Sequence, residues 1–248
     1  MTSDAPPAAG EADPLLARVW AVLQRWAVPV MMALAYALLA ATSDTGIAGK
    51  AWMAVGFAFV MVVWFVLRAL TETAALARAL GVGDVARLRE LADRYLPRKR
   101  RAADRAPFLV GQALAELLRG EPAAALAALE LAAPGDDLAP LAAAVRIAAL
   151  VELGRPAAEA RAALVAAPRA PALRGLAEGM IAWRDDQLDA AAARFTQVID
   201  DIRAGSVTRA IAHRYLARIA EARHEPTAAQ HRRAAAALAT PEATWLQA

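Results

Sequence analysis

Two long runs of residues without charge stand out near the start of the chain. Residues 26–43 (WAVPVMMALAYALLAATS) and 51–67 (AWMAVGFAFVMVVWFVL) contain no Asp, Glu, Lys or Arg. Each run approaches the roughly 18 to 20 apolar residues that a helix needs to cross a hydrocarbon core of about 30 Å. A short polar stretch with glycine joins them. The pattern predicts two antiparallel transmembrane helices, which place both chain ends on one side of the membrane.

After the second run the pattern becomes amphipathic. Residues 67–81 contain no helix-breaking signal, so we expect the second span to continue as a helix into solvent. Gly83 and Asp84 then predict a turn, and the next helix is expected over residues 85–96. Its apolar residues share one face, and Pro97 ends it.

A similar segment recurs five times along the rest of the chain. The segments begin at Gly83, Gly120, Gly154, Asp186 and His224, with separations of 37, 34, 32 and 38 residues. A period near 34 residues in Ala- and Leu-rich sequence predicts helical hairpins that stack, because each hairpin exposes an apolar face that only a neighbour can cover.

Over residues 70–241 the chain resembles the tetratricopeptide repeat (TPR) superfamily. Residues 172–200 match its motif best, with Gly179 and Ala191 at the small positions where two helices cross and Phe195 at the bulky one. In the last repeat the motif's positions are taken by Ala217, Ala229, Ala236 and Pro241. The resemblance implies an α-solenoid of about five helical hairpins.

We therefore predict an all-α chain in four parts. Residues 1–13 are polar, acidic and rich in Pro, which is typical of a disordered tail. Residues 14–70 form the transmembrane hairpin, residues 71–241 the TPR-like solenoid, and residues 242–248 a C-terminal tail.

The distribution of positive charge predicts the orientation in the membrane. The loop between the spans carries Lys50, offset by Asp44, whereas five arginines flank the spans: Arg18, Arg25, Arg68, Arg78 and Arg87. The positive-inside rule then places both termini and the repeats in the cytoplasm. The bias towards Ala and Arg is typical of a GC-rich bacterial genome, so we expect a bacterial inner membrane.

A basic run follows the helix predicted at residues 85–96. It consists of Arg98, Lys99, Arg100 and Arg101, with Arg94 and Arg105 close by in the sequence. If the helices before and after the turn at Gly83 have similar lengths, the chain returns this run towards the membrane surface, where anionic lipid headgroups attract it. The alternative is a solvated, charged linker. Nucleic acid is not an expected partner, since no aromatic residues are interleaved with the basic ones.

The resemblance also implies a surface for a protein partner. The first helix of each TPR hairpin lines the concave side of the solenoid, and here those helices supply Arg146, Met180, Trp183, Arg184, Arg214 and Arg218. An aromatic side chain ringed by arginines suits an acidic or C-terminal peptide segment. The alternative is that Trp183 packs between repeats and that the arginines are solvated.

The chain shows no pattern of an enzyme. It has no cysteine, which excludes disulfides, thiolate metal sites and thiol catalysis, and it lacks P-loop, GxSxG and GxGxxG motifs. Its histidines, His213, His224 and His231, are not accompanied by carboxylates at metal-ligand spacing. We therefore expect no catalytic residues, metal or cofactor. The leading hypothesis is a membrane-anchored adaptor that binds a protein; the alternative is a structural accessory subunit of a larger membrane complex.

Overall fold

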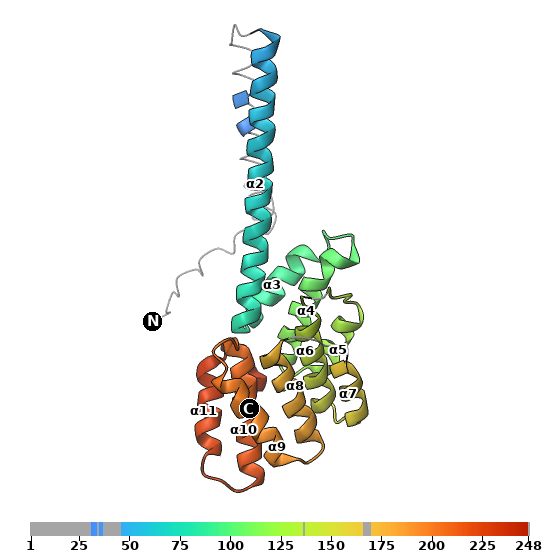
Figure 1. Cartoon of the computed structure of the whole chain (residues 1–248), viewed down its shortest axis with the longest axis vertical. Helices are drawn as coiled ribbons and strands as arrows, with labels where there is room; N and C mark the ends of the chain where they lie inside the picture. Colours follow the sequence, from blue (N-terminus) through green and yellow to red (C-terminus); the bar gives the residue numbers. More distant parts are fainter. Residues whose placement is uncertain (1–30, 34, 37–45, 136, 166–169, 248) are drawn as a thin grey trace, which may run out of the picture. The chain divides into compact units, whose positions relative to one another are not determined.

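The computed structural model describes residues 31–33, 35, 36, 46–135, 137–165 and 170–247. The chain divides into two compact units, Met1–Thr71 and Glu72–Ala248. The predicted N-terminal tail and most of the first predicted span lie outside the described residues. Over the residues that are described, all regular structure is helical and no strand is present, so the all-α prediction is confirmed (Figure 1).

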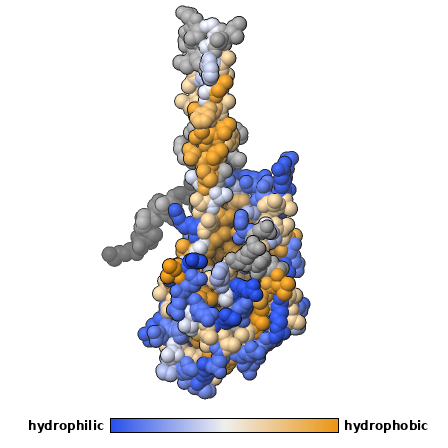
Figure 2. All heavy atoms as spheres, in the orientation of Figure 1, coloured by the Kyte–Doolittle hydropathy of each residue, from blue (hydrophilic) through white to orange (hydrophobic). Residues whose placement is uncertain are grey.

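The long helix α2 (Ile47–Val82) contains the second predicted span. It has 36 residues, or about 54 Å at 1.5 Å per residue. Within the described part of the chain, α2 is the one helix long and apolar enough to cross a membrane, from Ala54 onward, and its most apolar window buries none of its residues. Large side chains such as Trp52, Phe59 and Val62 are exposed, and Figure 2 shows this stretch as mainly hydrophobic surface.

A contact between aromatic rings joins the two predicted spans within the described part of the first unit. The rings of Tyr36 and Phe57 stack with their centroids 5.3 Å apart. Tyr36 belongs to the first predicted span and Phe57 to the second. Residues 31–33, 35 and 36 are themselves helical.

The second unit is a stack of short helices. They are α3 (Val85–Tyr95), α4 (Ala102–Leu118), α5 (Pro122–Glu130), α6 (Ala139–Glu152), α7 (Ala157–Val165), α8 (Pro171–Arg184), α9 (Leu188–Asp200), α10 (Ser206–Ala222), α11 (Ala228–Leu238) and α12 (Thr244–Gln247). Consecutive helices pack in pairs, most extensively α4 with α5, α8 with α9 and α10 with α11. The helices α4, α6, α8 and α10 also pack on one another in that order, which stacks the pairs.

The same turn closes the first helix of each pair. Among the described residues, five have φ between 58° and 82°, namely Gly83, Gly120, Gly154, Asp186 and His224. These are the residues at which the five aligned sequence segments begin. In all five turns the next residue donates its N–H to the carbonyl five positions back, as in the bond from Gln187 to Ala182 at 2.9 Å. This pattern is the Schellman motif, which requires a left-handed residue just after a helix.

The core of the second unit shows why the small residues of the motif are small. Gly179 of α8 lies directly against Phe195 of α9, and a Cβ atom at Gly179 would stand 2.7 Å from the ring. Phe195 is fully buried and stacks on Tyr215 of α10, with centroids 5.1 Å apart. The glycine therefore lets one aromatic side chain connect three helices.

The C-terminal residues close the stack onto its beginning. Residues 244–247, assigned to a tail by the sequence analysis, form α12, which packs on α4, α10 and α11. Trp245 and Leu246 are only 6% and 3% exposed. The Thr244 hydroxyl donates a hydrogen bond to the Arg119 carbonyl at 3.1 Å, and the Thr240 hydroxyl donates one to the Gly83 carbonyl at 3.2 Å. Burial of the two large apolar side chains, Trp245 and Leu246, is the physical reason that residues 244–247 pack against the stack as a helix.

Candidate functional site

The residues predicted to form one partner-binding groove lie at several different places in the second unit. Met180 is fully buried in the core, so it presents no surface to a partner. Arg184 is exposed, and its guanidinium donates hydrogen bonds to the carbonyls of Gly154 at 2.7 Å and Arg155 at 3.2 Å. Arg184 therefore ties the end of α8 to the turn after α6.

Trp183, Arg214 and Arg218 do come together, around the buried side chain of Tyr215. The Trp183 ring meets the Tyr215 ring edge to face, with centroids 6.3 Å apart. The Arg218 guanidinium carbon lies 5.5 Å from the Trp183 centroid and 5.6 Å from the Tyr215 centroid, within cation–π range. Trp183 is half-buried by these contacts, in agreement with the alternative that it packs between repeats.

Glu152 at the end of α6 binds this cluster from the other side. Its carboxylate accepts hydrogen bonds from the Tyr215 hydroxyl at 3.0 Å and from the Arg218 guanidinium at 2.6 Å. Burial raises the pKa of Tyr215 well above its ordinary value, and the Glu152 charge raises it further. The phenol thus stays protonated and acts as a hydrogen-bond donor that links α6 to α10. Sequence analysis missed Glu152, which is 63 residues from Tyr215 and carries no local signal.

Arg214, one helical turn before Arg218 on α10, lies against Trp245 of α12. Its guanidinium carbon lies 4.7 Å from the centroid of the Trp245 ring. Burial lowers the pKa of Arg214, and the neighbouring Arg218 charge adds to that effect. Neither the buried Arg214 Nε nor the buried Trp245 Nε1 has a hydrogen-bond partner among the described residues. Arg214 therefore contributes packing through its planar group on the indole.

The basic run lies in the turn between α3 and α4. Arg98, Arg100 and Arg101 are exposed, and no ion pair joins them to any described residue. Lys99 Nζ lies 6.0 Å from the centroid of the Tyr95 ring, and Arg94 pairs with Glu90 at 2.6 Å. Arg105 is half-buried, and its Nε lacks a partner among the described residues.

Tyr95, three residues before this run, contacts the end of α2 that belongs to the second unit. Its hydroxyl hydrogen-bonds the Glu72 carboxylate. Burial raises the pKa of Tyr95, and the Glu72 charge raises it further. In the sequence, Glu72 follows the last residue of the second uncharged run, Leu67, by five positions.

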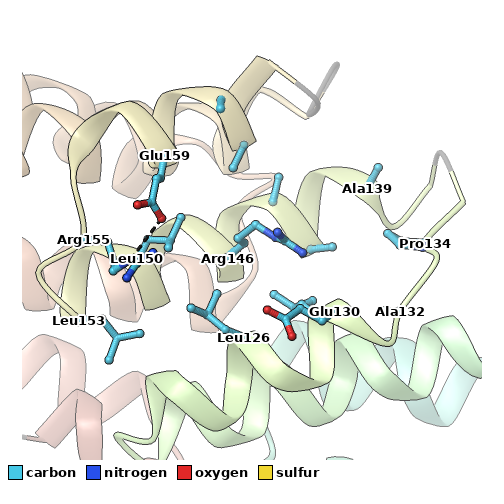
Figure 3. A pocket seen from close by; sticks show the side chains of 15 residues that line it. Leu126, Glu130, Ala132, Pro134, Ala139, Arg146, Leu150, Leu153, Arg155 and Glu159 are labelled. Atoms are coloured by element: carbon cyan, nitrogen blue, oxygen red, sulfur yellow. Dashed lines mark hydrogen bonds and ion pairs between the residues drawn. The ribbon is translucent and has the colours of Figure 1, made fainter.

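Arg146, the remaining predicted groove residue, lies in a different groove, between α5, α6 and α7. Figure 3 shows Arg146 and Leu150 on α6, with Leu126 and Glu130 on α5 below and Glu159 on α7 above. The groove has a volume of about 810 Å³ and is lined mainly by leucine and alanine. At one end Arg155 pairs with Glu159 at 3.2 Å, drawn as a dashed line in Figure 3.

The histidines His213 on α10 and His231 on α11 face each other. Their Nδ1 atoms are 3.1 Å apart, so one ring donates a hydrogen bond to the other. Burial lowers the pKa of both rings. The described part of the chain contains no group of three or more His, Cys, Asp or Glu side chains that could hold a metal ion.

Comparison of the chain with protein-family models, with curated proteins and with solved structures finds no match.

Proposed function

We propose that the protein is a membrane-anchored helical-repeat adaptor, which holds a protein partner at the cytoplasmic face of a bacterial inner membrane. The observation that carries the proposal is α2. Its apolar stretch exposes large hydrophobic side chains, which water disfavours and a lipid core accepts, and the same helix runs on to Val82. In the second unit the end of α2 buries Leu76 and Ala79.

Two further observations support parts of this proposal. The stacked rings of Tyr36 and Phe57 are the contact expected if residues 26–43 and 51–67 form a hairpin of two spans. The five equivalent turns and the stacking of alternate helices favour a TPR-like solenoid. Solenoids of this kind serve as binding surfaces because their stacked helices present an extended face.

No feature of the described residues favours an enzyme as strongly as α2 favours a membrane-anchored protein. Within the Tyr215 cluster, the Glu152 carboxylate accepts hydrogen bonds from the Tyr215 hydroxyl and the Arg218 guanidinium, and the raised pKa of Tyr215 keeps this phenol from acting as a base near neutral pH. We therefore keep the proposal of a non-enzymatic protein.

An accessory subunit of a larger membrane complex is the second candidate function. Gly56, within the apolar stretch of α2, has no described atom within 4 Å of where its Cβ would stand. On another face of the helix, Ala54 and Ala58 lie one turn apart, and small residues at this spacing let another helix approach closely in lipid.

Topology is the first test of the proposal. Reporters active only in the cytoplasm, or only in the periplasm, are fused separately after Ala248. Activity of the cytoplasmic reporter, together with recovery of the chain in membranes after an alkaline wash, is the expected result. Activity of the periplasmic reporter, or release of the chain by the wash, would overturn the proposal.

Purification after mild detergent extraction separates the two candidates. An adaptor is recovered without stoichiometric membrane subunits, whereas an accessory subunit is recovered with them. An Ala54→Leu/Ala58→Leu variant sharpens the test, because filling the strip formed by these two alanines releases such subunits from an accessory protein and leaves an adaptor unchanged.

A further inference from the structure

The groove between α5, α6 and α7 exists because its walls are short and its floor is lined by small residues. Helices α5 and α7 have nine residues each, whereas α6 has 14, so the two outer helices leave part of α6 uncovered. Alanine supplies much of the lining, including Ala142 and Ala143 on the floor and Ala162 and Ala163 on the α7 wall. Small side chains fill little of the space between helices that are about 10 Å apart.

The surface around this groove is unusually apolar for the second unit. From residue 85 onward, the described residues include four exposed large hydrophobic side chains: Leu131, Leu153, Val165 and Ile202. Leu153 lines the groove, Leu131 directly follows α5, and Val165 is the last residue of α7. Leu153 is thus an exposed large apolar side chain within the groove, and Leu131 and Val165 lie at the ends of groove-lining helices in the sequence. Exposed apolar side chains of this kind are typical of a surface that a partner covers.

The positive charge of Arg146 indicates which chemical group a bound partner would place in the groove. It lies on the floor, half-buried, and Figure 3 shows its side chain extending into the groove. No ion pair or hydrogen bond joins its guanidinium to another described residue, whereas Arg155 at the groove's end is already paired with Glu159. A guanidinium on an apolar floor binds a carboxylate more strongly than it would in open water, because the surrounding apolar groups reduce screening.

We propose that this groove binds an amphipathic helix of a partner protein, which places large apolar side chains against the alanines and a carboxylate against Arg146. The inference rests on the proposed adaptor function and names the class of partner. The 14 residues of α6 span about 21 Å, which matches about four turns of a bound helix. Leucine-sized side chains complement an alanine floor, as in other grooves that bind helices.

Site-specific photocross-linking in native membranes tests this inference with the full chain. A benzophenone amino acid replaces Ala143 on the groove floor or, as the matched control, the exposed Ala193 on α9. The expected adduct forms only from position 143. Its peptide, sequenced by mass spectrometry, belongs to a helix with an Asp or Glu within one turn of the cross-linked residue.

Charge reversal makes the test specific for Arg146. Arg146→Glu is expected to lower the yield of this adduct about tenfold, which corresponds to about 1.4 kcal/mol. The control Arg203→Glu, at an exposed arginine outside the groove, leaves the yield unchanged. Replacing the partner's acidic residue with Arg restores the adduct to the Arg146→Glu chain. A second variant, Ala162→Trp, fills the groove from its exposed wall and lowers the yield with Arg146 intact, while the circular dichroism spectrum stays unchanged.

The remaining outcomes overturn the inference. Adducts from position 143 to lipid, to this chain itself or to a segment without a carboxylate exclude the proposed occupant, as does a yield that Arg146→Glu leaves unchanged. Protein adducts from position 193 but not from position 143 would be consistent with the adaptor function. They would contradict the proposal that the partner binds in this groove. Absence of protein adducts from both positions contradicts both proposals.

Discussion

Five residues in left-handed conformation define the turns of the second unit, and they differ in what surrounds them. Three are glycines, and two, Asp186 and His224, carry side chains. A Cβ at Gly154 would meet open space, whereas a Cβ at Gly83 would stand 2.7 Å from a side-chain carbon of Val207. Replacing Gly154 with alanine therefore introduces backbone strain alone, whereas replacing Gly83 with alanine also introduces a steric clash.

This difference gives a prediction for paired variants. Gly154→Ala is expected to lower the free energy of unfolding by about 1 kcal/mol, since an L-residue pays about 1 to 2 kcal/mol in this conformation. Gly83→Ala is expected to cost about 1 to 3 kcal/mol more, because of the overpacking. Chemical denaturation of the detergent-solubilised chain, followed by circular dichroism, measures both. Equal losses would contradict the difference in packing.

The facing histidines predict a dependence of stability on pH. Burial lowers the pKa of His213 and His231 in the folded chain relative to the ordinary value of 6.5, and the Arg209 charge lowers that of His213 further, whereas Glu225 acts on His231 in the opposite direction. The unfolded chain then binds protons more readily than the folded chain. Their contribution to stability is present above about pH 6.5 and is lost as the pH falls below it.

We expect the free energy of unfolding to decrease as the pH is lowered from about 7 to 5.5, before most carboxylates titrate. His213→Gln is expected to reduce the slope, since it removes one titrating ring and its repulsion of the other. The exposed His224 offers a matched control, and His224→Gln should keep the slope. An unchanged slope in His213→Gln would contradict the role of the pair.

At the scale of the elements, α2 is the helix whose exposed surface demands an explanation. Phe59 is 68% exposed within its apolar stretch. A membrane location predicts that Phe59→Arg hinders insertion, since an arginine at mid-span costs about 2.5 to 3.5 kcal/mol. The fraction of chain that resists alkaline extraction from membranes should fall. Ala77→Arg, on an exposed position of α2 beyond the span, is the control and should insert normally.

The short helix α12 is the element that packs the C-terminal end of the chain onto α4. Its Trp245 is buried, and the indole N–H has no hydrogen-bond partner among the described residues. Trp245→Ala is therefore expected to destabilise the chain by about 3 to 5 kcal/mol, the usual cost of removing a buried aromatic side chain. Trp245→Phe should cost much less, because it keeps most of the apolar contact and loses no hydrogen bond. Thermal unfolding of the two variants measures the difference.

At the scale of the whole molecule, the basic run predicts a contact with anionic lipid. Because the chain has no cysteine, Ala103→Cys allows a fluorophore to be attached next to the run. We expect energy transfer from this fluorophore to headgroup-labelled lipid to increase when nanodiscs contain anionic lipid, since each basic residue gains about 1 kcal/mol near such a surface.

Reversal of the charges is the matching control for the lipid contact. Changing all four residues from Arg98 to Arg101 to Glu should abolish the increase, and changing Arg203, Arg232 and Arg233 to Glu should leave it in place. The contact would also weaken with added salt, because screening shortens its range. An increase that survives the reversal at Arg98–Arg101 would show that the run is a solvated linker.

Features of the fold that depend on the spacing of nearby residues could be predicted from the sequence. The uncharged run at residues 51–67 predicted a long apolar helix, and α2 contains it. The first residues of the five recurring segments are also the five residues in left-handed conformation, namely Gly83, Gly120, Gly154, Asp186 and His224. A turn of this kind depends on only a few neighbouring residues, so its position is visible in the sequence. Gly179 and Phe195, which the resemblance assigns to a small and a bulky position of the motif, pack against each other.

Tertiary structure alone decided which distant side chains meet. It joined Glu152 to Tyr215 and Arg218, buried Met180, and separated Arg146 from Trp183 by placing it in another groove. It also ordered residues 244–247, since Trp245 finds an apolar surface only after α4 and α10 have packed. Such contacts join residues tens of positions apart, and their free energy depends on the burial and charge that neighbouring helices create, which no local pattern records.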